Sequence, residues 1–183
     1  MYSYISEYIE YLETEKTLSV NTVKSYSSDL IRFCDYIKDQ DISELSNIKR
    51  QTINSYIRHI RKSKCSSSTI NRKSVSLRGW FSWLISKKLI LDDPTINLEQ
   101  PKIERFLPKV LTIKEIEILL DNTKTPQEKA IIELLYSSGL RVTELINLKH
   151  EDIDLEANYL KCKGKGNKER LIPIGNQSKY ALN

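Results

Sequence analysis

The sequence predicts a mainly α-helical protein: a bundle of four helices over residues 1–100, a linker over 101–109, and an α+β domain with a β-hairpin over 110–183. Three observations predict this organisation. Apolar residues recur every three or four positions through the first 90 residues, which is the spacing of helices that bury one face. Residues 99–108 contain two prolines and no sustained periodicity, as linkers do. Two short strand-like runs flank a glycine-containing turn near the end.

The four helices of the bundle are separated by short polar breaks. The first carries a stripe of apolar residues on one face: Ile5, Tyr8, Ile9 and Leu12. Ser19 suits the N-cap of the second helix, which is expected to run to about Lys38. The third covers roughly residues 49–62. The fourth follows the serine-rich break and runs to about residue 87, with Trp80 and Trp83 expected in packing contacts because helical spacing accounts for both.

Two helix starts are well marked in the second domain. Thr112-x-x-Glu115 and Thr125-Pro126-x-Glu128 are capping boxes, in which a hydroxyl and a carboxylate satisfy the first free N–H groups of a helix. The second of these helices is expected to end at Gly139, a residue suited to a left-handed C-terminal position. Its expected buried residues are Ile131, Ile132, Leu134 and Leu135. A short helix follows from about Arg141.

A β-hairpin is expected after these helices. Strand-like runs over 159–162 and 169–174 enclose the turn Gly164-Lys165-Gly166-Asn167. Lys165 is therefore expected at the tip of the hairpin.

Composition excludes several classes of protein. No run approaches the roughly 18 apolar residues that span a membrane, and the acidic first residues lack the pattern of a signal peptide, so we expect a cytoplasmic protein without a membrane partner. Cys34, Cys65 and Cys162 are too scattered for a disulfide framework or a metal site. His59 and His150 have no partner at metal-ligand spacing. We expect no metal, no cofactor and no small-molecule ligand.

Positive charge is concentrated in one segment. Residues 45–91 contain eleven Lys or Arg and no Asp or Glu, whereas the remaining residues carry 18 basic and 24 acidic side chains. Such segregation is typical of a surface that binds a polyanion, because each neutralised phosphate releases counterions. A solvated helical face is the alternative. We predict these DNA-binding residues, outside the expected core face or near the hairpin: Arg72, Lys73, Ser76, Arg78, Lys49, Arg50 and Lys168.

Arg141 and Lys165, 24 residues apart, suit the two tasks of phosphodiester cleavage. An arginine binds two phosphate oxygens with a planar fork that stays charged, and a lysine can protonate a departing alkoxide. By residue type alone, an arginine after a helix-ending glycine and a lysine in a turn are more often ordinary surface residues, and it is their spacing and neighbours that favour the catalytic reading.

Several motifs along the chain are typical of one known family. The second helix carries Thr22, Tyr26, Asp29, Leu30 and Phe33, and the fourth carries Ile70-Asn71-Arg72-Lys73 and Leu77-Arg78. The most specific motifs are Gly139-Leu140-Arg141 with Glu144-Leu145, and Gly164-Lys165-Gly166-Asn167-Lys168-Glu169-Arg170. With these residues the sequence closely resembles the tyrosine recombinase (phage integrase) family, and within it the Xer-like bacterial recombinases. The resemblance extends from the first helix to the last strand.

The resemblance implies a SAM-like core-binding domain over residues 1–100 and the first part of a catalytic domain over 110–183. It implies that Arg141 is the first catalytic arginine, that Lys165 is the hairpin lysine, and that Glu144 supports Arg141. It also implies cleavage through a 3′-phosphotyrosyl intermediate without metal or cofactor, on double-stranded DNA, by a self-associated tetramer or together with a second recombinase.

The sequence departs from the family pattern after the hairpin. Complete members carry a His-x-x-Arg motif, a further His or Trp and a nucleophilic tyrosine, none of which we find here; Tyr180 follows Lys165 too closely to be that nucleophile. We therefore expect DNA binding without cleavage by these residues alone, and apolar surface left uncovered in the second domain, with self-association or local disorder after about residue 150. The chain is read either as a portion of a recombinase or as a non-enzymatic DNA-binding protein that competes with one. The residues leave open the target sequence and the choice between chromosome partition and mobile-element integration.

Overall fold

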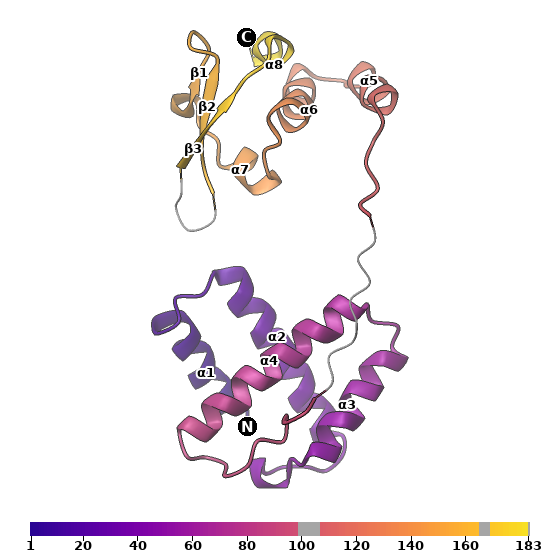
Figure 1. Cartoon of the computed structure of the whole chain (residues 1–183), viewed down its shortest axis with the longest axis vertical. Coiled ribbons are helices and arrows are strands. Elements are labelled where there is room, and N and C mark those ends of the chain that lie inside the picture. Colours follow the sequence, from indigo (N-terminus) through magenta and orange to yellow (C-terminus); the bar gives the residue numbers. More distant parts are fainter. Residues whose placement is uncertain (99–106, 165–168, 183) are drawn as a thin grey trace. The chain divides into compact units, whose positions relative to one another are not determined.

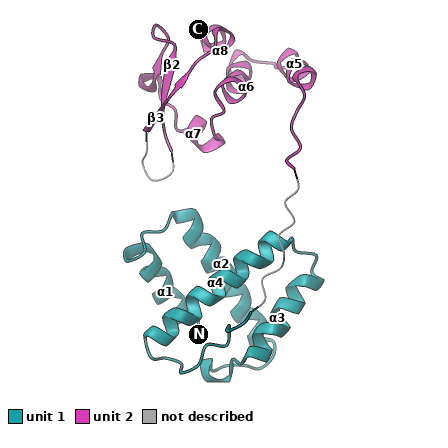
Figure 2. Cartoon of the chain, viewed as in Figure 1, with its two compact units in different colours: residues 1–106 teal, residues 107–183 magenta. Residues whose placement is uncertain are grey.

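The computed structural model describes residues 1–98, 107–164 and 169–182. The chain divides into two compact units, residues 1–106 and 107–183, which are coloured separately in Figure 2. The expected linker lies largely outside the described residues, and the expected domain boundaries stay predictions. No helix in the described ranges is long and apolar enough to cross a membrane.

Four helices build the first unit, and their order along the chain can be followed in Figure 1. They are α1 (Tyr2–Thr14), α2 (Val20–Lys38), α3 (Arg50–Lys62) and α4 (Ser67–Ser86), with a single 3-10 turn η1 (Leu45–Asn47) before α3. Serine hydroxyls fix two of the starts, since Ser19 accepts a hydrogen bond from the N–H of Thr22 and Ser66 accepts one from Thr69. The helix positions expected from periodicity are confirmed to within two residues.

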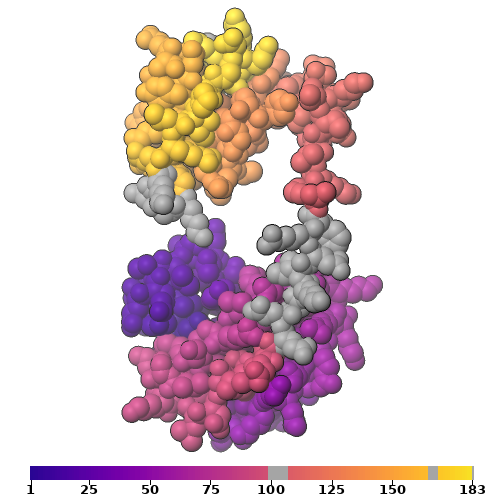
Figure 3. All heavy atoms as spheres, viewed as in Figure 1, coloured from indigo at the N-terminus to yellow at the C-terminus, as the bar shows by residue number. Residues whose placement is uncertain are grey.

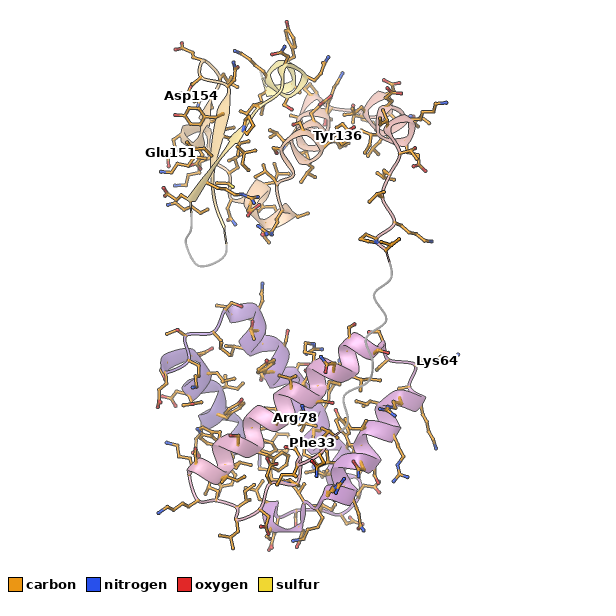
Figure 4. All side chains as sticks on the ribbon, viewed as in Figure 1. Phe33, Lys64, Arg78, Tyr136, Glu151 and Asp154 are labelled. Carbon is orange, nitrogen blue, oxygen red and sulfur yellow. The ribbon has the colours of Figure 1, made fainter. Side chains whose placement is uncertain are left out.

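Helices α2 and α4 form the centre of this bundle, because each of them contacts the other three helices. In α4, Trp80 and Phe81 are fully buried and pack against Phe33 of α2, Leu84 is fully buried in the same core, and Trp83 packs beside Tyr8 of α1. Figure 4 labels Phe33 among the side chains that the helices enclose. The prediction that both tryptophans serve packing is confirmed.

The second unit combines short helices with a small sheet. Its elements are α5 (Ile113–Asp121), α6 (Pro126–Ser138), α7 (Val142–Ile146), η2 (His150–Asp152), β1 (Ile153–Asp154), β2 (Tyr159–Lys163), β3 (Glu169–Pro173) and α8 (Asn176–Leu182). The strands form an antiparallel sheet in the order β1-β2-β3. Both capping boxes are present, and Gly139 ends α6 with a left-handed φ of 60°, as expected.

Three elements of this unit, η2, β1 and α8, were not expected. Strand β1 has two residues, too few for a visible pattern, and α8 occupies the polar stretch after the hairpin. Helix α8 packs on α6 through small side chains, where the hydroxyls of Ser137 and Ser178 lie 2.6 Å apart. Of the four residues of α6 expected to be buried, Leu134 lies in the core, Ile132 and Leu135 are half-buried, and the expectation for Ile131 is wrong because its side chain is exposed.

Apolar side chains remain uncovered in the second unit. Helix α5 contributes no buried residue, and its atoms lie at the margin of this unit in the space-filling view (Figure 3). The large exposed apolar residues include Ile113, Ile118, Val142, Ile146 and Leu171. The expected uncovered apolar surface is therefore present in the structure, whereas self-association and disorder stay predictions.

Candidate nucleic-acid interface and active site

Arg141 begins helix α7, and the local chain path explains its position. The left-handed turn at Gly139 ends α6, Leu140 is buried, and Arg141 has the extended backbone of an N-cap residue. Glu144, three residues later, closes the cap: its Oε2 accepts the backbone N–H of Arg141 at 2.7 Å, and its Oε1 accepts Nη1 of the Arg141 guanidinium at 2.7 Å. The same carboxylate thus fixes both the backbone and the side chain of Arg141.

Glu144 is buried and ionised. Its side chain is 4% exposed, and Nη2 of Arg170 on β3 donates a third hydrogen bond to Oε2 at 2.9 Å. The backbone N–H of Arg141 lowers the pKa of Glu144 most, and the guanidinium groups of Arg141 and Arg170 lower it further, although burial opposes them. A carboxylate with these donors stays charged at neutral pH.

The outer part of the Arg141 guanidinium is available to a ligand. Its side chain is 66% exposed although one Nη is bound to Glu144. A guanidinium held at one nitrogen and open at the others can present two parallel N–H donors to a phosphate. Lys165 and Lys168, which were predicted beside this site, lie outside the described residues.

In the first unit, exposed cations gather along one face of α3. Arg50, Asn54, Arg58 and Arg61 follow helical spacing and line a shallow hollow of about 360 Å³ with Asn97 and Leu98. Lys49, the residue before α3, is exposed as well. Within residues 1–98 the structure pairs none of these cations with a carboxylate. Figure 4 labels Lys64 at the turn between α3 and α4, another exposed cation of the same segment.

Two predicted DNA-binding residues are not on the surface. Lys73 is 4% exposed in its side chain, and its Nζ lies 2.9 Å from Oδ1 of the buried Asp29 on α2. Ser76 is fully buried and donates its hydroxyl to the carbonyl of Lys73. Their burial contradicts the prediction of both as DNA contacts: Lys73 joins α4 to α2 through Asp29, and Ser76 bonds within α4.

Arg72 and Arg78 are partly exposed and already bound within the unit. Arg72 forms an ion pair with Asp29 and also donates to the carbonyl of Ser25, while 41% of its side chain remains exposed. Arg78 donates to the carbonyl of Leu98. Both side chains therefore connect α4 to neighbouring segments, and a contact with DNA stays a prediction for each.

The sequence-based site omitted Arg58, Arg61 and Arg170. The first two could have been found from helical spacing, because Arg58 and Arg61 lie three residues apart and Arg61 falls about three turns after Arg50 on the same face. Arg170 pairs with Cys162 across the β2–β3 ladder, whereas a turn centred on residues 164–167 would have placed Glu169 opposite Cys162, so the register differs by one residue from the predicted one. Its contact with Glu144 has no sequence signal, since it depends on how the sheet packs against α7.

Comparison with known proteins matches both units to one family. Residues 5–88 match the phage integrase N-terminal SAM-like domain, and residues 109–183 match the phage integrase family. The chain is 38% identical to the tyrosine recombinase XerD of Halalkalibacterium halodurans over 184 residues, which cover 97% of this chain and 62% of the relative. It is 34% identical to the tyrosine recombinase XerC of Herpetosiphon aurantiacus, covering 100% of this chain and 61% of the relative.

Solved structures show the same fold at lower identity. A lambda integrase dimer bound to a COC′ core site matches with a TM-score of 0.77 and 19% identity, covering 100% of this chain and 65% of that one. A lambda integrase tetramer bound to a Holliday junction matches with a TM-score of 0.77 and 19% identity, covering 98% and 54%. The chain spans about three fifths of the length of the curated relatives it matches. On the two domain matches and the identity to the Xer recombinases, the chain belongs to the phage integrase family of tyrosine recombinases and has Xer-like sequence.

Proposed function

We propose that this chain supplies the DNA-binding domain and the first catalytic arginine of a site-specific DNA recombinase. Arg141 would bind the non-bridging oxygens of the scissile phosphate, and Glu144 would hold it in place. Lys165 would protonate the departing oxygen as a general acid. The observation that carries this proposal is the geometry of Arg141, which is anchored by a buried carboxylate on one side and open to solvent on the other.

The proposed duplex surface includes the basic face of α3. Arg50, Arg58 and Arg61 lie along one side of a 13-residue helix, about 16 Å from first to last at 1.5 Å per residue. That length allows contacts with more than one phosphate of a strand. Phosphate contacts of this kind give affinity and orientation rather than sequence specificity.

A multimer on double-stranded DNA is part of the proposal. Relatives of the same fold include a lambda integrase dimer bound to a core site and a tetramer bound to a Holliday junction. We place the action of this chain in the cytoplasm, which is supported by its three free cysteines, because free thiols are typical of a reducing compartment.

A salt titration of binding to a short DNA duplex tests the duplex surface. The variant R58A/R61A removes two exposed cations of α3, and K16A/K38A is the matched control, since both lysines are exposed and lie outside residues 45–91. The slope of log K against log salt decreases by about 1 for each phosphate that the protein no longer neutralises. We expect R58A/R61A to lower the slope by about 2 and the control to leave it unchanged. Equal slopes for the two variants would exclude α3 from the interface.

A further inference from the structure

We propose that Arg170 is a positioning residue, which ties the β2–β3 hairpin to the carboxylate that holds Arg141. The inference rests on the proposed function, because it assigns Arg141 and the hairpin that carries Lys165 to one site. It adds a residue whose role is to fix one of these parts relative to the other.

The first step is the bonding of Glu144. From the described residues Glu144 accepts three hydrogen bonds, and two of them come from Arg141, three residues earlier, at 2.7 Å each. The third comes from Arg170, which is 26 residues away and lies on another element. This third bond connects the start of α7 to the sheet through the buried carboxylate.

The second step is the hydrogen bond that the Arg170 guanidinium makes on its other side, to the neighbouring strand. Its Nε donates to Sγ of the buried Cys162 at 3.1 Å, and Cys162 is the residue directly opposite Arg170 on β2. The guanidinium therefore bonds at once to its partner strand and to Glu144. A lysine cannot replace it, because a single ammonium lacks the two separated nitrogens that reach both groups.

The third step concerns the hairpin. Lys163 and Glu169 form the last strand pair after Cys162 and Arg170, and Lys165 follows two residues after β2 ends. Glu169 also forms an ion pair with Lys161 at 2.7 Å, so an ion pair joins β2 and β3 next to Arg170. Arg170 thus anchors the strand ends from which the Lys165 segment departs. A small displacement of a catalytic group costs rate, which gives such an anchor a function.

The test compares R170K, which keeps the charge, with R170Q, which removes it. K161Q is the control, because Lys161 is a cation of the same sheet that binds Glu169 and makes no ion pair with Glu144 among the described residues. Nuclear magnetic resonance of the isotope-labelled full chain follows the titration of the Glu144 carboxyl and the exchange rate of the Arg141 guanidinium N–H. We expect both Arg170 variants to raise the pKa of Glu144 and to speed that exchange about tenfold, and K161Q to change neither.

Two outcomes would overturn the proposal. Wild-type behaviour of R170K would mean that Arg170 acts only through its charge. Unchanged Glu144 and Arg141 signals in both variants, with a DNA salt slope lowered by about 1 in R170Q, would make Arg170 a direct phosphate contact, which its 42% exposed side chain permits.

A second variant covers the case in which Arg170 substitutions unfold the sheet. E144Q leaves the sheet untouched and is expected to speed exchange of the Arg170 guanidinium N–H about tenfold; unchanged exchange there would also refute the link. The magnetic resonance signals of Glu144, Arg141 and Arg170 are recorded without DNA, so they test the link separately from the proposed function.

Discussion

Replacing Asp29 by alanine is expected to destabilise the first unit by about 3–5 kcal/mol, because it leaves a buried cation without a partner. The carboxylate of Asp29 accepts hydrogen bonds from the charged side chains of both Lys73 and Arg72. When the carboxylate is removed, Arg72 can turn to water, since 41% of its side chain is already exposed. Lys73 cannot, because only 4% of its side chain is exposed. The cost therefore comes mainly from the ammonium of Lys73.

Urea unfolding followed by tryptophan fluorescence measures this cost in the whole chain. The two tryptophans of the sequence, Trp80 and Trp83, both lie in α4, so their fluorescence reports on the first unit alone. The double variant D29A/K73M removes both buried charges, and the methionine fills the space of the lysine chain. We expect it to recover most of the loss, since an apolar replacement of a buried ion pair is often neutral.

Two results would refute this reasoning. If D29A costs less than about 1 kcal/mol, Lys73 reaches solvent and the pair behaves as a surface ion pair. If K73M lowers the salt slope of DNA binding by about 1 with unchanged stability, Lys73 contacts a phosphate, as the sequence suggested and the structure contradicts.

Two further predictions concern local packing and pH. G79A is expected to destabilise the first unit by about 1–3 kcal/mol in the same fluorescence assay, because a Cβ on Gly79 would overlap the hydroxyl of Tyr8. This overlap outweighs the better helix propensity of alanine. The double variant G79A/Y8F should recover part of the lost stability, and an equal loss in both variants would contradict the overlap. Hydrogen bonds from the backbone N–H and hydroxyl of Thr112 lower the pKa of Glu115, so its contribution to the start of α5 is present above its unfolded pKa and is lost as the pH falls through the folded one. The protection of the amides in the first turn of α5, taken as their exchange rate relative to an unstructured peptide at the same pH, should therefore decrease on acidification below the ordinary glutamate value of 4.5. The same pH dependence in E115Q would contradict this cause.

Much of the fold could be predicted because its signals are local. Ser19, Thr112 and Thr125 mark helix starts through hydrogen bonds to residues three positions away, and Gly139 marks an end through its own backbone. Such signals are contained in a few consecutive residues. The sequence of α8 contains no such local signal, since this helix depends on its contact with α6, where Ser137 and Ser178 meet although they lie 41 residues apart in the sequence.

The site was predicted less completely for the same reason. The motif identified Arg141 and its partner Glu144, which are three residues apart. The role of Lys73 was mistaken, because its residue type suggests a phosphate contact and only the packing of α2 on α4 places Asp29 beside it. Arg170 was missed as a partner of Glu144, because their contact joins a strand to a helix start.

The most direct test of the proposed DNA contacts is the titration of a short duplex into the isotope-labelled chain, with the arginine side-chain N–H signals observed by nuclear magnetic resonance. The proposal predicts saturable shifts of Arg58, Arg61 and Arg141 that disappear as salt is added. Shifts confined to other arginines, or unchanged spectra at low salt, would contradict it.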